Sequence, residues 1–170
     1  MRVRGRRRLR WAAVAGVVVA GGLVVWLWLG TGGRAIPLPR ARAYTAFSAC
    51  LLTGPRGLAD ERVAPVWAGM QEASLATRAK VSYLPVAGPG TVGAAMPDLA
   101  TLVLRHCDVI IAVGPPETAA VSADSRRFPG TRFVTVGPGT ARSNVTVVPA
   151  GSADAVRSRV ASLVEAATQG

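Results

Sequence analysis

Short apolar runs alternate with amphipathic segments along the chain from residue 44 onward. The clearest run, 107–114, holds consecutive apolar residues from Val109 to Val113, as expected of a central strand in a parallel sheet covered on both faces. In 59–78, apolar residues recur near one face of a helix. Pro97 fits the first position of another helix. The pattern predicts strands at 46–54, 79–87, 107–114, 131–137 and 143–149, and helices at 59–78, 97–106, 115–127 and 156–167.

The order of these elements is β-α-β-α-β-α-β-β-α. The loop 137–142 leaves no room for a helix between the last two strands. Repeated βα units require right-handed crossovers, which predicts a three-layer, open α/β fold of the flavodoxin-like kind with a mainly parallel five-stranded sheet.

An uncharged run of 19 residues, 11–29, precedes this region. As a helix it measures about 28 Å, close to the hydrocarbon thickness of a bilayer. Six arginines precede the run and three follow it within 31–42, so the positive-inside rule keeps the N-terminus cytoplasmic and exports the rest. We therefore expect a cytoplasmic Arg-rich tail (1–10), one transmembrane helix (11–29), a Gly/Pro/Arg linker (30–43) and an extracytoplasmic domain (44–170), located at the cell membrane.

The alternative interpretation of the N-terminal segment is a cleaved signal peptide. Ala41-Arg42-Ala43 has the form of a cleavage site, and Cys50 could be the modified residue of a lipoprotein. Both lie well beyond the apolar run, which favours the uncleaved anchor.

The charge of the chain is concentrated at its N-terminus. The net charge is +11, yet outside 1–10 and 31–42 the chain holds 11 basic and 9 acidic residues. The predicted domain is therefore nearly neutral, which argues against nucleic-acid binding. Arginines beside a membrane span are better explained by topology and anionic lipid.

Four predicted strands end in Gly/Pro-rich loops, at 53–57, 87–91, 113–117 and 136–140. In open α/β sheets, ligands bind beyond the carboxyl ends of the strands. Such loops are also the ordinary turns of a βα fold. The candidate ligand-binding residues at these ends are Thr53, Arg56, Asp60, Gly114, Glu117 and Gly137.

No catalytic constellation is visible in the sequence, so we expect a protein that is not an enzyme. The segment 88–93 matches G-x-G-x-x-G, but no acidic residue ends the next strand, which favours a Gly-rich loop without a cofactor. One His and two Cys exclude a His/Cys zinc cluster. His106 is adjacent to Cys107 at a predicted turn, where the two side chains seldom converge for catalysis.

Two buried free thiols are the favoured interpretation of the cysteines, and a disulfide is the alternative that an exported domain permits. Counted back from the strand ends, Cys50 and Cys107 are staggered by about 10 Å, beyond the usual Cα limit of a disulfide.

Several of these segments (49–74, 107–121 and 127–137) resemble the basic membrane protein family, the purine-nucleoside-receptor-like substrate-binding proteins of ABC transporters. The matching motifs are Trp67-Ala68-Gly69 and the segment 128–133, FPGTRF. The composition is similar to that of a GC-rich actinobacterium. The resemblance implies one lobe of a type I periplasmic binding fold.

The resemblance implies a membrane-anchored substrate-binding-like domain. The expected ligand is a nucleoside or similar solute, and the expected partner is an ABC transporter permease or a sensor. The alternative is a structural or interaction module, derived from such a lobe, that has lost its ligand site.

Overall fold

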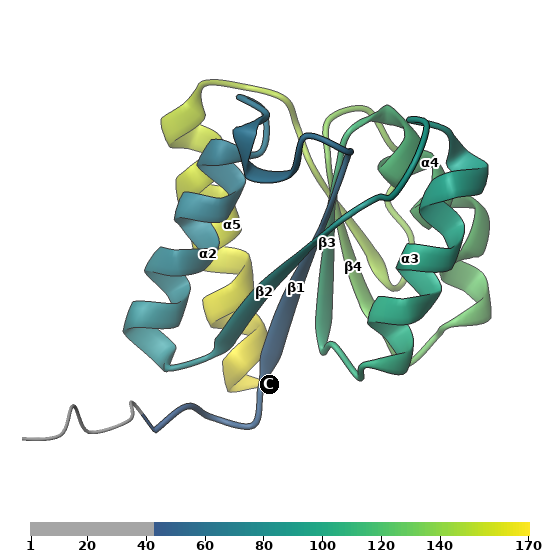
Figure 1. The fold of residues 1–170 in the computed structure, drawn as a ribbon. Coiled ribbons are helices and arrows are strands. Elements are labelled where there is room, and N and C mark those ends of the chain that lie inside the picture. The colour runs from purple at the N-terminus through teal and green to yellow at the C-terminus, as the bar shows by residue number, and fades with distance from the viewer. Residues whose placement is uncertain (1–42) are drawn as a thin grey trace, which may run out of the picture. The chain divides into compact units, whose positions relative to one another are not determined.

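The predicted strands form one sheet in the computed structural model, which describes residues 43–170 (Figure 1). The strand order is β2-β1-β3-β4-β5, and every pairing is parallel. The prediction of a mainly parallel five-stranded sheet is therefore confirmed. The strands are β1 (Ser48–Thr53), β2 (Lys80–Pro85), β3 (Val109–Val113), β4 (Arg132–Val136) and β5 (Val145–Val148).

Helices cover both faces of the sheet, which gives the predicted three layers (Figure 1). One layer holds α2 (Ala64–Thr77) and α5 (Ala153–Gln169), and the other holds α3 (Val92–Leu104) and α4 (Pro115–Asp124). Two short 3₁₀ turns, η1 (Gly57–Ala59) and η2 (Ser125–Arg127), complete the fold.

Alternate residues of β1 feed two separate cores. Ala49 and Leu51 point to the layer of α2 and α5, whereas Cys50 and Leu52 point to the layer of α3 and α4. All five residues of β3 are buried, as the continuous apolar run predicted for a central strand. The two-sided burial explains why so much of the domain is aliphatic.

Helices α2 and α5 pack closely at Gly69. A β-carbon at this position would meet the backbone oxygen of Arg157. The glycine of the Trp67-Ala68-Gly69 motif is therefore required by helix packing.

The connection between β4 and β5 crosses the sheet without a helix, as expected from its length. A β-carbon on Gly139 would lie 3.1 Å from Thr135 Oγ1 and 3.5 Å from a methyl group of Val147. The loop therefore lies on the face that also carries α3 and α4. Arg142 fixes it by donating hydrogen bonds to Ser122 O (2.6 Å) and Ser125 Oγ (3.3 Å).

Helices α2 and α3 each begin five residues away from the predicted start. Pro97 lies inside α3 and does not begin it, because Thr91 caps the helix earlier by accepting a hydrogen bond from the Ala94 amide (3.3 Å). Helix α2 begins at Ala64, five residues after the predicted start. The Asp60 carboxylate accepts from the Arg62 amide (3.0 Å), which stabilises a turn where the helix was expected to begin.

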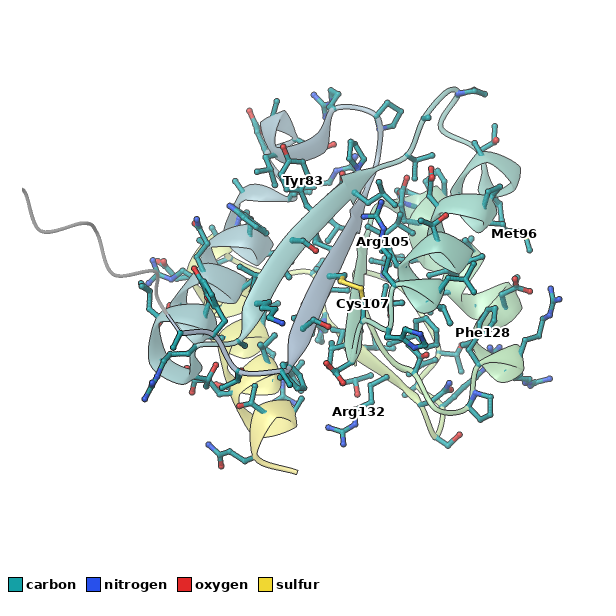
Figure 2. The ribbon with its side chains drawn as sticks, turned by 60° about the horizontal axis from the view of Figure 1, so that its bottom comes forward. Tyr83, Met96, Arg105, Cys107, Phe128 and Arg132 are labelled. Carbon is teal, nitrogen blue, oxygen red and sulfur yellow. A yellow bond between two sulfur atoms is a disulfide. The ribbon has the colours of Figure 1, made fainter. Side chains whose placement is uncertain are left out.

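The prediction of two free thiols is wrong, because Cys50 and Cys107 form a disulfide (Figure 2). Ile110 is the register partner of Cys50 on β3, so an extended chain would place Cys107 too far along the strand. The chain before Val109 is not extended. His106 has a φ of 56°, and the Cys107 amide still donates to Leu102 O (3.3 Å). This turn closes α3 and brings the two α-carbons to 5.9 Å.

The predicted tail (1–10), membrane helix (11–29) and nearly all of the linker (30–43) lie outside the described residues. Within 43–170, no helix combines the length and apolar character needed to cross a membrane.

Candidate functional site

The candidate site lies where the carboxyl ends of β1 and β3 meet. From β1 the chain continues to β2 on one side of the sheet, and the later strands are added on the other side. Thr53 and Val113, the last residues of β1 and β3, are register partners. The loops that follow them therefore diverge toward opposite layers, which opens a crevice at the topological switch point.

Two adjacent cavities occupy this crevice. The smaller, about 180 Å³, is lined by Arg56, Asp60, Arg62 and Glu117, among others. The larger, about 370 Å³, extends toward β4 and the start of α5. It is lined mainly by apolar residues, among them Pro65, Val136, Pro138, Ala150 and Val156. The residues that line both cavities are Arg62, Val113, Gly114 and Pro115.

Asp60 is the anchor of the loop after β1. Its carboxylate accepts hydrogen bonds from Arg56 Nη2 (2.8 Å) and from Arg62 Nε (3.1 Å), Nη2 (2.9 Å) and the backbone amide (3.0 Å). The Arg62 side chain is the main cause that holds the pKa of Asp60 well below its ordinary value. The oxygens of Asp60 are thus occupied within the chain. The two arginine side chains remain more than half exposed.

Glu117 differs from Asp60, because it is a buried carboxylate that no described arginine side chain pairs with. It lies in the first turn of α4 and is only 1% exposed. Burial raises the pKa of Glu117, and a hydrogen bond with its own backbone and, to a smaller extent, the nearby charge of Arg62 oppose that shift. No partner within 43–170 donates a hydrogen bond to Glu117 Oε1.

Gly114 makes room for this carboxylate. Gly114 has a φ of 117°, and a β-carbon there would collide with Glu117 Oε2. A β-carbon on Gly54, at the end of β1, would lie 3.6 Å from Glu117 Oε1. The helix dipole at the start of α4 favours a negative charge in this position. The loops thus hold a carboxylate between the two central strands.

The structure brings most of the predicted site residues together. Arg56, Asp60, Gly114 and Glu117 line the smaller cavity, and Gly137 lines the larger one. Thr53 lies beneath them, fully buried, and its hydroxyl donates to Gly54 O (3.2 Å).

Sequence reasoning missed Arg62. Its side chain lines both cavities. The signal was its position two residues after the candidate residue Asp60, near the start of the segment predicted to be a helix.

The other chemical candidates do not form sites. Gly90 lines the smaller cavity, and no other residue of the G-x-G-x-x-G segment does. Cys107 is held in the disulfide, so it offers no thiol beside His106. Among residues 43–170, no group of three His, Cys, Asp or Glu side chains could hold a metal ion.

Comparison with known proteins identifies the fold and no family. No protein-family model matches the chain, and no curated protein matches it. A fragment from Peptoclostridium difficile 630, described as a lipoprotein, superposes with a TM-score of 0.61 at 14% identity. The match covers 72% of this chain and 98% of the fragment. This chain therefore shares its α/β fold with almost the whole of that fragment.

Two longer solved proteins match less well. One is an ABC transporter solute-binding protein from Aeropyrum pernix K1, with a TM-score of 0.49, 19% identity and coverage of 59% of this chain and 28% of that one. The other is a transcriptional activator of the comK gene from Bacillus halodurans, with a TM-score of 0.49, 15% identity and coverage of 59% and 33%. This chain spans about a third of each, and matches at this level carry no argument about it.

Proposed function

We propose that residues 44–170 form an extracytoplasmic binding module for a small solute. The observation that carries the proposal is the pair of adjacent cavities at the switch point of the sheet, where open α/β folds bind ligands. An apolar cavity beside a few convergent polar groups is the usual composition of a small-molecule site. A nucleoside, or a solute of similar size with one flat apolar part, suits this composition.

The proposed location is the outer side of the cell membrane, with segment 11–29 as a single-pass anchor and the N-terminus cytoplasmic. The disulfide supports this, because such bonds persist in oxidising compartments and are rare in the cytosol. The proposed partner is an ABC transporter permease or a membrane sensor. We propose a binding role without catalysis and without nucleic acid.

Thermal unfolding of the full-length chain, with and without a panel of nucleosides and other small metabolites, tests the proposal. A ligand that binds only the folded form at 100 times its dissociation constant adds about 2.7 kcal/mol, which corresponds to a shift of several degrees. We expect one chemical class to raise the transition selectively.

A matched pair of variants locates the binding. Ala150 lines the larger cavity and is exposed, so Ala150→Trp should fill the cavity and abolish the shift. Ala76 is exposed on α2, outside both cavities, so Ala76→Trp should preserve it. A panel without any shift, or a shift that Ala150→Trp leaves intact, refutes binding at this crevice. The first of these results favours the alternative of an interaction module.

A further inference from the structure

Glu117 is a buried carboxylate with one oxygen that no described residue satisfies. Among the described side chains, only Glu117 Oε1 and Thr135 Oγ1 are buried polar atoms without a hydrogen-bond partner. A buried carboxylate without a partner is costly, whereas a neutral side chain of the same shape is far less so. Gly114 nevertheless leaves space for the Glu117 carboxylate, because a β-carbon there would collide with Oε2.

The neighbouring charges do not satisfy Glu117. Arg56 and Arg62 both turn to Asp60, at 2.8 and 2.9 Å. Arg62 acts on Glu117 only through its charge, and no ion pair joins them. Glu117 lines the smaller cavity, and its Oε1 receives no hydrogen bond from residues 43–170, so a donor that satisfies it has to come from outside these residues.

The larger cavity indicates the chemistry of the rest of a ligand whose donor group reaches Glu117. Its lining is mostly apolar and begins at the residues shared with the smaller cavity, including Val113 and Pro115. A molecule that reaches Glu117 from this side would place its remaining atoms against valine and proline side chains. The polar end and the apolar body of the ligand would thus be adjacent.

We propose, as an extension of the proposed function, that Glu117 is the ligand-binding carboxylate and that the module takes solutes with an amidine-like edge. Such an edge presents two parallel N–H donors, which match the two oxygens of a carboxylate. The apolar part of the solute lies in the larger cavity. Solutes whose polar end accepts hydrogen bonds are rejected, because they leave Glu117 unpaired and face it with a second acceptor.

Benzamidine, benzamide and benzoate are three probes of nearly equal shape that test this inference. The polar end of benzamidine presents two N–H donor groups. That of benzamide presents one donor and one acceptor, and that of benzoate presents two acceptors. In calorimetric titration of the full-length chain we expect benzamidine to bind with a dissociation constant of about 1 mM or below. We expect benzamide to bind at least about tenfold more weakly and benzoate not to bind.

Glu117→Gln and Glu72→Gln are the matched variants. Glu117→Gln places an N–H group opposite the donors of benzamidine and should weaken its binding at least about tenfold. Glu72 is exposed on α2 outside both cavities, so Glu72→Gln should leave binding unchanged. The unliganded Glu117→Gln chain should unfold at the same or a higher temperature, because it lacks the unpaired charge.

Three results would overturn the inference. One is the absence of saturable benzamidine binding, the second is tighter binding of benzoate through Arg62, and the third is a clear fall in the unfolding temperature of Glu117→Gln. The third would mean that the carboxylate serves the fold. If the metabolite panel yields a ligand whose affinity Glu117→Gln leaves unchanged, this inference fails while the proposed binding function stands.

Discussion

Removal of the disulfide should destabilise the domain strongly. Cys50 and Cys107 are 57 residues apart, and a cross-link of this span removes about 14 cal/mol/K of entropy from the unfolded chain. At 25 °C this corresponds to about 4 kcal/mol of unfolding free energy. A domain of this size has an unfolding entropy of roughly 0.27 kcal/mol/K, so the transition should fall by about 15 °C.

The comparison uses one protein in two states and one variant. The untreated chain, the chain reduced with dithiothreitol and the double variant Cys50→Ala/Cys107→Ala are melted under the same conditions and followed by circular dichroism. Both sulfurs are buried, so reduction must be carried out in denaturant before refolding. Thiol titration of the untreated chain in denaturant should find no free thiol among these two residues.

Agreement between the reduced chain and the double variant separates the cross-link from packing, since only the variant loses the sulfur atoms. If all three samples melt together, the bond does not constrain the unfolded chain as the entropy argument requires. Two free thiols in the untreated chain would restore the original prediction from the sequence and remove the support for an oxidising compartment.

Four other changes test separate parts of the structure. Gly69→Ala should cost about 1–3 kcal/mol in chemical denaturation because its methyl group meets the Arg157 carbonyl, whereas Gly93→Ala, which meets nothing within 4 Å, should be neutral or slightly stabilising. Asn144→Ala should cost about 2 kcal/mol, since the Asn144 amide donates to three carbonyls of the segment 125–131; equal stability would contradict this. Asp60 has a lowered pKa, so it adds stability above its ordinary pKa of 3.8 that is lost as the pH falls; Asp60→Asn should reduce stability at pH 7 and flatten the acid limb of the stability curve. Glu117 has a raised pKa, so its contribution is lost as the pH rises above 4.5, and Glu117→Gln should remove that loss.

The architecture could be predicted because the apolar pattern encodes burial directly. The unbroken run of β3 requires cover on both faces, and the short loop after β4 excludes a helix. The boundaries were harder, because they depend on single side chains. Thr91 begins α3 ahead of Pro97, and Asp60 delays α2, through hydrogen bonds that periodicity does not contain.

The disulfide could not be predicted by counting residues along extended strands. The estimate assumed that the chain is extended from Cys107 to the end of β3. A left-handed His106 and a helix-closing hydrogen bond shorten the path. A non-glycine residue with positive φ is uncommon enough that sequence reasoning does not assume one.

The location of the candidate site could be predicted from the sequence, but the hydrogen bonding of its carboxylates could not. Gly114 and Glu117 were expected at a strand end, and they line the crevice there. The sequence could not show that two arginines donate hydrogen bonds to Asp60, while Glu117 Oε1 has no hydrogen-bond partner among the described residues. That difference arises from side-chain directions, which depend on both loops at once.

Both ends of the described chain lie at the end of the sheet where the strands begin, opposite the crevice (Figure 1). The amide of Thr45 donates to Arg78 O just before β2, and Arg132, which begins β4, donates to Ala167 O near the end of α5. An affinity tag, fluorophore or sensor surface attached after Gly170 would therefore lie about a strand length from the cavities. The domain can be immobilised through its C-terminus with its crevice facing the solution, which suits it to surface-based screening.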